Sequence, residues 1–400
     1  MKNKQPISKP SATVAALRSP GGKSGFTLVE LLVTISIIAI MAGLFLAGLQ
    51  STVDSGRIAA TKATIAKINN LVMQRYESYR QRRVPITIVV TPTGVDANGA
   101  SGLTNVSSTT PQILAAGWRL DALRELMRCE LPDHWSDIVV QSSGLANNPV
   151  GYPNGTAAAG RPCLTPPSLL QAYFRKFNAI TTANHSAGRT PTGTPAWSSN
   201  ANSPSTSYEG AECLYLICTT GISDEMDAQE QFRPNEVGDF DGDGALEFLD
   251  AWGHPIAFLR WAPGFRSELQ TQVDPDPFDP RHVYASAYPS PTGTAASAYP
   301  PASTQKVVAT YGNGTFALYP LIMSAGPDGY LDIVTKYGAE LAVSAGNNDP
   351  FYSSTSAFSG GVSGYIGPYG TIADVDGPGS APDGVLENAD NITNHLMGTK

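Results

Sequence analysis

Residues 26–49 read FTLVELLVTISIIAIMAGLFLAGL, and this stretch decides the architecture of the chain. At about 1.5 Å of rise per residue it forms a helix of roughly 36 Å, which crosses a hydrocarbon core of about 30 Å with some tilt. The apolar core of an ordinary secretory signal is shorter, about 7–15 residues. We therefore interpret the stretch as a membrane-spanning helix.

The charges on the two sides of this stretch are uneven. Five of the 26 Lys and Arg residues lie within residues 1–25, which contain no acid, so the remaining 21 stand against all 34 acidic residues, a balance of −13. The positive-inside rule keeps residues 1–25 in the cytoplasm and exports the rest. An acidic exported part argues against nucleic-acid binding through a general positive field, and it is compatible with sites for divalent cations.

Glu30 is the one charged residue in the apolar stretch. A charged side chain at the centre of a membrane helix costs about 2.5–3.5 kcal/mol on insertion scales. Glu30 lies near the cytoplasmic end, where the cost is smaller, and its carboxylate can extend toward the lipid head groups. A helix that served only as a membrane anchor would be more stable with Leu at this position, so we expect the carboxylate to have a partner.

The residues around Glu30 match a known pattern. Residues 23–30, read KSGFTLVE, closely resemble the leader junction of type IV prepilins, in which Gly is followed by Phe and then Thr-Leu-Val-Glu. The resemblance implies that a prepilin peptidase cuts between Gly25 and Phe26, and that the new amino group of Phe26 is methylated. It also implies that Glu30, the fifth residue of the mature chain, neutralises the Phe26 amine of a neighbouring subunit.

The same resemblance implies partners and a location. The expected partners are other filament subunits, the prepilin peptidase and an assembly platform in the inner membrane, and no nucleic acid is expected. The chain would cross the inner membrane once, with a cytoplasmic N-terminus and a periplasmic head. Four regions follow: a leader at 1–25, a transmembrane half-helix at 26–49, an amphipathic half-helix at 50–83 and a globular head at 84–400.

An amphipathic pattern continues the apolar helix. Its apolar residues recur at helical spacing, and they are Ile58, Ile65, Ile68, Val72, Tyr76 and Tyr79. Such a stripe indicates a helix with one buried face, and no proline interrupts it before Pro85. We predict one helix from residue 27 to residue 83, with its second half packed on the head of the same chain.

The head reads as a mixture of helices and strands joined by long loops. Gly and Pro make up 70 of the 400 residues, which favours loops. The predicted strands are 86–91, 256–261, 306–311 and 315–323, the predicted helices are 118–128 and 167–180, and 208–219 suits either. The stretches 185–207 and 284–304, rich in Ser, Thr, Ala, Pro and Gly, are expected to be exposed loops. The fold class is α+β, with a long N-terminal helix packed on an antiparallel sheet with large loop insertions.

Residues 239–250 read DFDGDGALEFLD and resemble a calcium loop of the EF-hand or dockerin kind. Ca²⁺ takes six to eight oxygen ligands, and alternating acids on a tight turn converge on one point. The sixth position is Gly244, as the sharp turn of such a loop requires. The candidate ligands are Asp239, Asp241, Asp243, the carbonyl of Ala245, Glu247, and Asp250 in place of the usual final Glu. The alternative is a solvated acidic turn.

Two further segments indicate a particular branch of the family. Residues 250–255 (DAWGHP) resemble the Asp-x-Trp-Gly-x-Pro segment of type II secretion pseudopilins, and residues 324–329 (SAGPDG) are similar to their later Ser-x-Gly-x-Asp-Gly segment. The resemblance implies that Asp328 is a Ca²⁺ ligand, although an ordinary turn there is an alternative. The function predicted is a structural subunit of a pilin-like filament, and the alternative is a minor pilin or tip adhesin.

The cysteines and the search for catalytic motifs say little about the function. The four cysteines Cys129, Cys163, Cys213 and Cys218 allow either two disulfides or buried free thiols. The sequence contains no HExxH, GxSxG, Walker-type or GxGxxG motif, and its five histidines are scattered. We therefore predict that the chain is not an enzyme.

Overall fold

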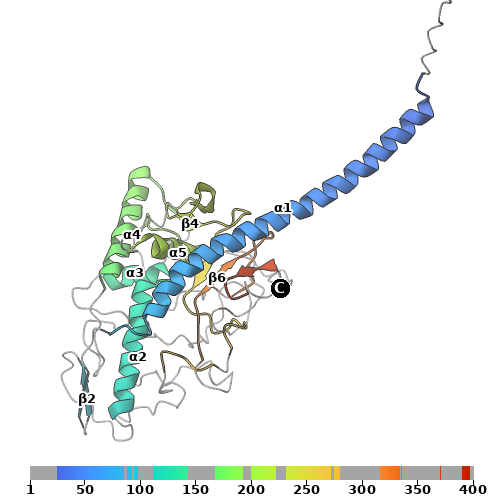
Figure 1. Cartoon of the computed structure of the whole chain (residues 1–400). Helices are drawn as coiled ribbons and strands as arrows, with labels where there is room; N and C mark the ends of the chain where they lie inside the picture. The colour runs from blue at the N-terminus through green and yellow to red at the C-terminus, as the bar shows by residue number, and fades with distance from the viewer. Residues whose placement is uncertain are drawn as a thin grey trace, which may run out of the picture. The chain divides into compact units, whose positions relative to one another are not determined.

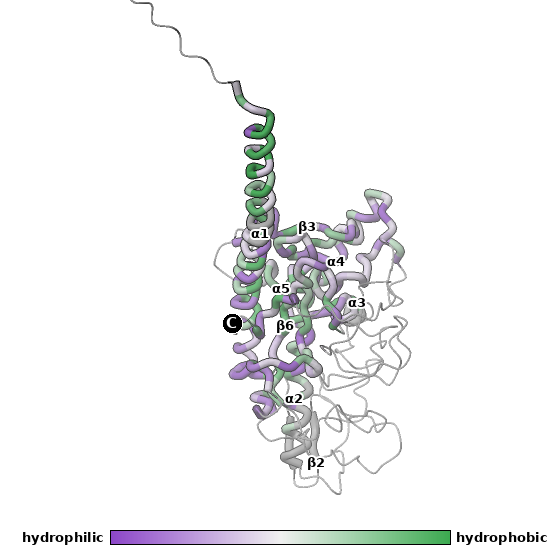
Figure 2. Tube along the Cα trace, turned by 90° about the vertical axis from the view of Figure 1, so that its right-hand side faces the viewer, coloured by the Kyte–Doolittle hydropathy of each residue, from purple (hydrophilic) through white to green (hydrophobic). Residues whose placement is uncertain are grey.

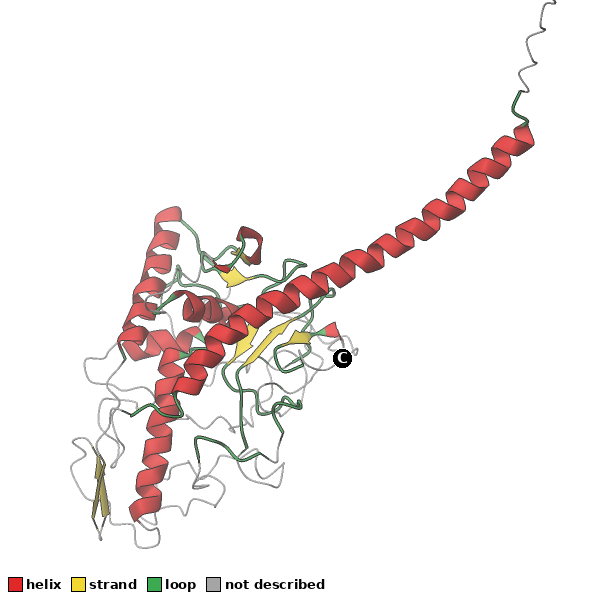
Figure 3. Cartoon of the chain, viewed as in Figure 1, coloured by secondary structure: helices red, strands yellow, loops and turns green. Residues whose placement is uncertain are grey.

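The computed structural model describes part of the chain, in two compact units that comprise residues 1–55 and residues 56–400. Helices and strands of the described residues are drawn in Figure 3. The predicted strand 306–311, the loop 284–304 and Cys163 lie outside the described residues. Those residues are 25–84, 88–91, 94–97, 111–142, 167–191, 200–221, 231–271, 274–279, 316–333, 335, 370 and 390–396.

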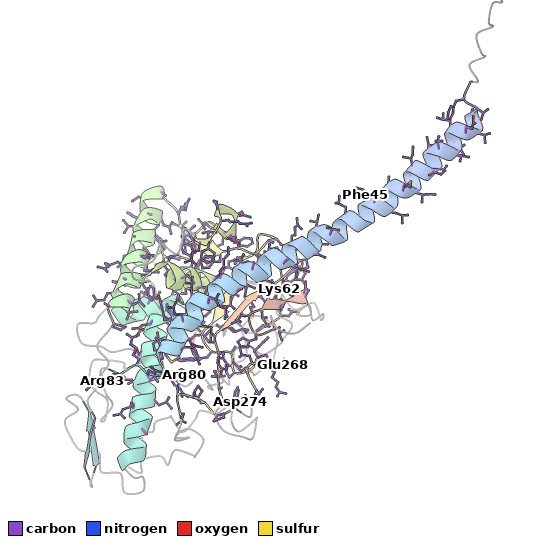
Figure 4. The ribbon with its side chains drawn as sticks, in the orientation of Figure 1. Phe45, Lys62, Arg80, Arg83, Glu268 and Asp274 are labelled. Carbon is purple, nitrogen blue, oxygen red and sulfur yellow. The ribbon has the colours of Figure 1, made fainter. Side chains whose placement is uncertain are left out.

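The first unit contains the N-terminal part of helix α1 (Leu28–Ser78), which runs without interruption for 51 residues. Within the described residues, Leu28–Phe45 is the helical stretch long and apolar enough to cross a membrane, and no part of the protein buries it. This part of the helix is almost entirely hydrophobic (Figure 2). Phe45 projects from it and is 71% exposed (Figure 4). The apolar surface of this unit therefore needs a cover that the described residues do not supply.

The second part of α1 contributes one face to the main core of the second unit. The predicted stripe is confirmed from Ile65 to Tyr79, since Ile65, Ile68, Val72, Tyr76 and Tyr79 are all buried in one hydrophobic cluster. The expectation was wrong for Ile58, which is exposed. The described residues from 52 to 60 are exposed and burial starts at Thr61, so the head does not reach back as far as Ile58.

In the described part of the second unit four further α-helices pack together: α2 (Pro111–Glu130), α3 (Trp135–Ser142), α4 (Ser168–Ala187) and α5 (Glu209–Thr219). The helices predicted at 118–128 and 167–180 are confirmed as parts of α2 and α4. Helix α3 was not predicted. The ambiguous segment 208–219 is a helix, and nine of the eleven residues of α5 are buried. A helix buried on most sides shows no period that separates it from a strand.

An antiparallel sheet of order β5-β6-β7 packs against α5, with β5 (Ala257–Leu259), β6 (Leu321–Ser324) and β7 (Ile392–Thr393). In register, Phe258 pairs with Ile322 and Met323 with Thr393. Every residue of the central strand β6 is buried, and α5 packs against β5. Figure 1 shows α5 and the sheet beside the second half of α1. The α+β class expected from the sequence is confirmed.

Two small hairpins complete the described strands. Strands β1 (Ile88–Thr91) and β2 (Gly94–Ala97) form one, and β3 (Val237–Gly238) and β4 (Glu247–Phe248) form the other, just after the 3-10 helix η3 (Pro234–Glu236). The strand predicted at 86–91 is confirmed in its described part, β1. The prediction of one strand at 315–323 was too long. Phe316 makes an isolated bridge to Pro275, and β6 begins only after Pro320, whose ring nitrogen cannot donate to a ladder.

Side-chain hydrogen bonds tie α1 to distant parts of the second unit. Arg75 donates from Nη1 to the Tyr173 hydroxyl at 2.7 Å and from Nη2 to the Thr220 carbonyl at 3.0 Å. The side-chain amide of Asn394, just after β7, donates to Asn69 Oδ1 on α1 at 2.8 Å. The helix is thus fixed to α4, to the end of α5 and to the last strand.

All three cysteines that the structure describes, Cys129, Cys213 and Cys218, are buried, and Cys213 and Cys218 are free thiols. Burial raises the pKa of Cys218 to about 12, so this thiol stays protonated and unreactive. For Cys213 and Cys218 the free-thiol alternative is the right one.

A buried network of charges joins the α2–α3 connection to the strand β5. Arg260 donates to Asp133 Oδ1 at 3.0 Å and to Asp137 Oδ2 at 2.9 Å, and Arg128 pairs with Asp137. His134 Nδ1 lies 2.9 Å from Asp133 Oδ1. Removing one partner of such a network leaves an uncompensated buried charge, which costs about 3–5 kcal/mol. The network is therefore structural.

The protonation of His134 should make stability depend on pH. Burial lowers the pKa of His134, but the charges of Asp133 and Glu209 outweigh burial and raise the pKa to about 9, against 6.5 for an ordinary His. The folded state thus favours the proton, and this contribution is fully present below about pH 6.5 and is lost as the pH rises through about 9. We expect the unfolding free energy to fall by about 1–3 kcal/mol over this range.

Urea unfolding of the detergent-solubilised full chain, followed by tryptophan fluorescence at about pH 6 and about pH 10, measures this fall. His134→Gln should show a clearly smaller fall than the parent, because other groups that titrate in the same range are common to both chains. Equal falls in the two chains would mean that His134 is not charged in the folded state.

Candidate functional site

The predicted cleavage junction lies in exposed backbone ahead of α1. Residues 25–27 are irregular, and the helix begins at Leu28. Phe26 is 74% exposed, and a side chain added at Gly25 would meet no atom within 4 Å. Peptidases cut accessible bonds outside regular structure, and the Gly25–Phe26 bond has this character.

Glu30 has a partner within its own chain. The Thr27 backbone N–H and the Thr27 hydroxyl both donate to Glu30 Oε2 at 3.0 Å, and the Glu30 backbone N–H donates to Thr27 Oγ1 at 3.2 Å. This reciprocal pair is a capping box, which satisfies two N–H groups at the start of a helix. Sequence reasoning missed it, although the Thr-x-x-Glu spacing of residues 27–30 is its signature.

The capping box leaves the charge of Glu30 available. Glu30 is exposed, and its carboxylate lies at the positive end of the dipole of α1. Hydrogen bonds from Thr27 orient the carboxylate without neutralising it, because neither donor is charged. A cationic group from outside the chain can therefore still pair with it.

The acidic loop is held between β3 and β4. Gly238 pairs with Glu247 in the hairpin, and residues 239–246 form the turn. Gly244 has φ +91°, and a side chain on it would lie 2.6 Å from Asn184 Oδ1 of α4. Any other residue would be strained at this φ and would push the Asn184 side chain aside. The tight turn expected at Gly244 is present.

Backbone N–H groups of the loop orient its three aspartates. The Gly244 N–H donates to Asp239 Oδ2 at 3.1 Å, the Asp243 N–H to Asp241 Oδ1 at 3.3 Å, and the Ala245 N–H to Asp243 Oδ1 at 2.9 Å. The loop's own backbone thereby fixes one oxygen of each carboxylate. Asp241 is exposed, whereas Asp243 is buried.

The loop brings acids together in two overlapping groups. Oxygens of Asp239, Asp241 and Asp243 lie within 4.8 Å of one another, and so do oxygens of Asp241, Glu247 and Glu212. Two oxygens on one Ca²⁺ at roughly 2.4 Å each lie at most about 4.8 Å apart, so both groups have the spacing of ligands. Glu212 comes from α5 and was missed from the sequence, because no local pattern connects it to the loop.

The electrostatics of the cluster disfavour its full ionisation. Burial first, and then the charges of Asp241 and Asp243, raise the pKa of Glu247 to about 8, against the hydrogen bond from the Phe240 N–H. Burial and the nearby acid Asp243 likewise raise the pKa of Glu212. Each further ionised carboxylate in this cluster costs free energy, so either a cation or protons must compensate the negative charges.

The stretch predicted as an exposed loop at 185–207 contributes to this cluster. Residues up to Ala187 close α4, and Ser205 is buried. Its N–H donates to Asp243 Oδ2 and its hydroxyl to Asp241 Oδ2, both at 2.6 Å. The expectation of an exposed loop was wrong for this part of the stretch. Ser205 can be buried because its polar groups are hydrogen-bonded to the two carboxylates.

Asp250, the proposed last ligand of the loop, lies elsewhere. Its Oδ1 accepts from the N–H groups of Trp252 and His254 at 2.9 Å, and its Oδ2 accepts from the Ser324 hydroxyl at 2.6 Å. It is absent from the groups of acids that the described residues form. The bridge between Leu249 and Pro255 closes a separate turn around Asp250, which the spacing of a single loop did not reveal.

The two segments that resemble pseudopilins meet at this turn. Besides the bond between Ser324 and Asp250, His254 Nδ1 lies 3.1 Å from the Gly326 carbonyl. The strands β5 and β6 that follow and precede them pair directly. Residues 250–255 and 324–329 therefore form one junction, far apart in sequence and joined in space.

Asp328 lies at this junction beside Asp390. The Tyr330 N–H donates to Asp328 Oδ1 at 3.0 Å. Burial and the charge of Asp328 raise the pKa of Asp390, and Asp390 also approaches Gly326. The structure thus places Asp328 with Asp390 rather than with the acidic loop.

Comparison with known proteins agrees with the N-terminal geometry. Residues 21–46 match the family described as the prokaryotic N-terminal methylation motif. No match was found among curated proteins or solved structures. The motif and the apolar helix together define the chain as a type IV pilin-like protein that is processed as a prepilin. This class implies cleavage by prepilin peptidase, a single-pass membrane anchor and assembly into filaments.

The processed chain should begin at Phe26 and carry a methyl group on its amine. Gly25→Val should block cleavage and leave the protein at its precursor mass, because the structure has room for Val and the effect falls on peptidase recognition. Gly22→Val, upstream of the junction, is the matched control and should be processed like the parent. Mass spectrometry of the N-terminal peptide distinguishes the forms, and a mature N-terminus other than Phe26 would contradict this junction.

Proposed function

We propose that the chain is a pseudopilin, a structural subunit of a type II secretion-like filament and not an enzyme. The observation that supports it most is the junction of residues 250–255 with residues 324–329, since both segments resemble those of pseudopilins. The acids and bases of the buried network pair with one another, as in a structural network rather than a catalytic one. The acidic exported part supports a role without nucleic acid.

In the proposed arrangement, residues 1–25 stay in the cytoplasm and the head lies in the periplasm. Cleavage after Gly25 frees a cationic amine at Phe26 within an apolar surrounding. Glu30 of a neighbouring subunit pairs with that amine, since two opposite charges in a low dielectric attract strongly and either alone is costly. Inner-membrane assembly proteins insert each subunit so that this pair forms.

The charge of Glu30 should be essential for polymerisation. Glu30→Gln keeps the capping box, because Gln at this position also accepts from Thr27. The variant should nevertheless fail to form filaments. We expect the amount of assembled protein to fall at least about tenfold, which corresponds to a loss of roughly 1.4 kcal/mol of assembly free energy. Sheared filaments are quantified against membrane-bound subunits by immunoblot.

Asp54→Asn is the matched control for this experiment. It removes an exposed acid from the same helix and should assemble normally. Normal filaments from Glu30→Gln would mean that the carboxylate serves only as a helix cap.

Ca²⁺ at the junction is part of the proposal. The family resemblance implies a ligand role for Asp328, and the adjacent Asp390 supports it. Asp390 Oδ1 is buried without a hydrogen-bond partner in the described part of the chain. A cation between these two carboxylates would offset their repulsion and hold the turn after β6.

A second candidate is a minor pilin or tip adhesin. It is favoured by the helices α2–α5 and by a cavity of about 250 Å³ lined mainly by α4, α5 and the acidic loop. A binding subunit uses such an enlarged head to recognise a surface or cargo.

Deletion of the chain in its host tests the proposed function. Export of secreted proteins should stop while surface pili remain, and the parent chain, but not Glu30→Gln, should restore export. Immunogold labelling should decorate filaments along their length. Normal export with a loss of surface pili would contradict the pseudopilin proposal, and label confined to filament ends would favour the tip candidate.

A further inference from the structure

We propose that Glu212 of α5 and the loop 239–247 together hold one Ca²⁺ ion, which clamps the loop to the core of the head. The ligands are Asp239, Asp241, Asp243 and Glu247 of the loop with Glu212. The inference concerns a site in the second unit and does not depend on the type of filament.

Three buried carboxylate oxygens point to a missing ligand. Asp239 Oδ1, Glu247 Oε1 and Glu212 Oε1 are buried and accept no hydrogen bond in the described part of the chain. Glu212 and Glu247 are 1% and 0% exposed. Leaving a buried acceptor unsatisfied costs about 1–3 kcal/mol, and more if it is charged.

The second oxygen of each carboxylate is held in place. The Gly244 N–H donates to Asp239 Oδ2, the Phe240 N–H donates to Glu247 Oε2 at 3.0 Å, and the indole N–H of Trp135 donates to Glu212 Oε2. Each carboxylate is thus fixed by one oxygen and presents the other. This is how backbone donors prepare an oxygen site for a metal.

A solvated acidic turn does not account for the arrangement. Glu212, Asp243 and Glu247 are removed from water, which normally screens like charges. The basic side chain that pairs with the loop, Arg189, is half exposed and lies 3.8 Å from Asp239. A cation between the carboxylates compensates their charge more directly.

The donors favour Ca²⁺ over other divalent ions. All are oxygens on an irregular turn, and Ca²⁺ accepts six to eight oxygens in flexible geometry. Mg²⁺ requires a near-ideal octahedron and gives up water reluctantly, while structural Zn²⁺ sites use Cys and His in a tetrahedron. Exposed Asp241, shared by both groups of acids, leaves room for water ligands.

The ion would connect parts of the core that are distant in sequence. Helix α5 packs on both β4 and β5, and Glu212 lies on α5. Bound Ca²⁺ would hold the β3–β4 hairpin against the helix that supports the sheet. The head should then be more stable with Ca²⁺ than without it.

Calorimetry of the detergent-solubilised full chain with Ca²⁺ tests the site, in an Asp328→Asn background that removes the contribution of the other acidic pair. Saturable binding is expected, and Glu212→Gln should weaken it about tenfold or more, since affinity follows the number of charged ligands. Glu209→Gln is the matched control: it alters a buried acid on the same helix that also contacts Trp135 but lies outside the acidic groups.

Two further measurements keep the test independent of folding. Asp241→Asn changes an exposed side chain, so it should fold like the parent by circular dichroism and still lose most of the Ca²⁺ binding. Tb³⁺ bound beside Trp135 should show luminescence sensitised by tryptophan, which Ca²⁺ displaces. Absence of saturable binding in the Asp328→Asn background would overturn the site, and unchanged affinity in Glu212→Gln would overturn the role of α5.

Discussion

An apolar helix surface that the described residues leave exposed is the constraint on which the rest of the structure depends. None of residues 28–45 is buried in the described part of the protein. Water is an unfavourable environment for this surface, so it must lie in lipid or against other helices of the same kind. Within it, Glu30 is the one group whose interaction can depend on charge, and the capping box with Thr27 holds that group at the helix start.

In contrast to this exposed apolar surface, the second unit buries many charged side chains. Its core combines the apolar stripe of α1 with ion pairs such as Arg260 with Asp133 and Asp137. Buried ion pairs add little net stability, but the loss of one partner is costly, so they fix the packing of α2, α3 and β5. The carboxylates around Glu247 differ, because acids rather than bases surround them.

Local patterns predicted much of this structure, and contacts between distant segments set the limit. The long helix, α2, α4 and the acidic turn followed from periodicity and spacing. Glu212 could not be found because its partners are distant in sequence, and Asp250 was misplaced because a hydrogen bond to Ser324 draws it away. Helix α3 is too short for a clear period, with eight residues. Ile58 fits the stripe, yet only tertiary packing decides where the head begins.

The pairing of β7 with the central strand has a consequence for biogenesis. Ser324 of β6 pairs with Ile392, and Asn394 bonds to Asn69, so the sheet and its link to α1 need residues that the ribosome adds late. Folding that depends on such distant contacts is slow. In the proposed topology, translocation of the nascent chain can therefore run ahead of folding, and the head would cross the membrane before its sheet is complete.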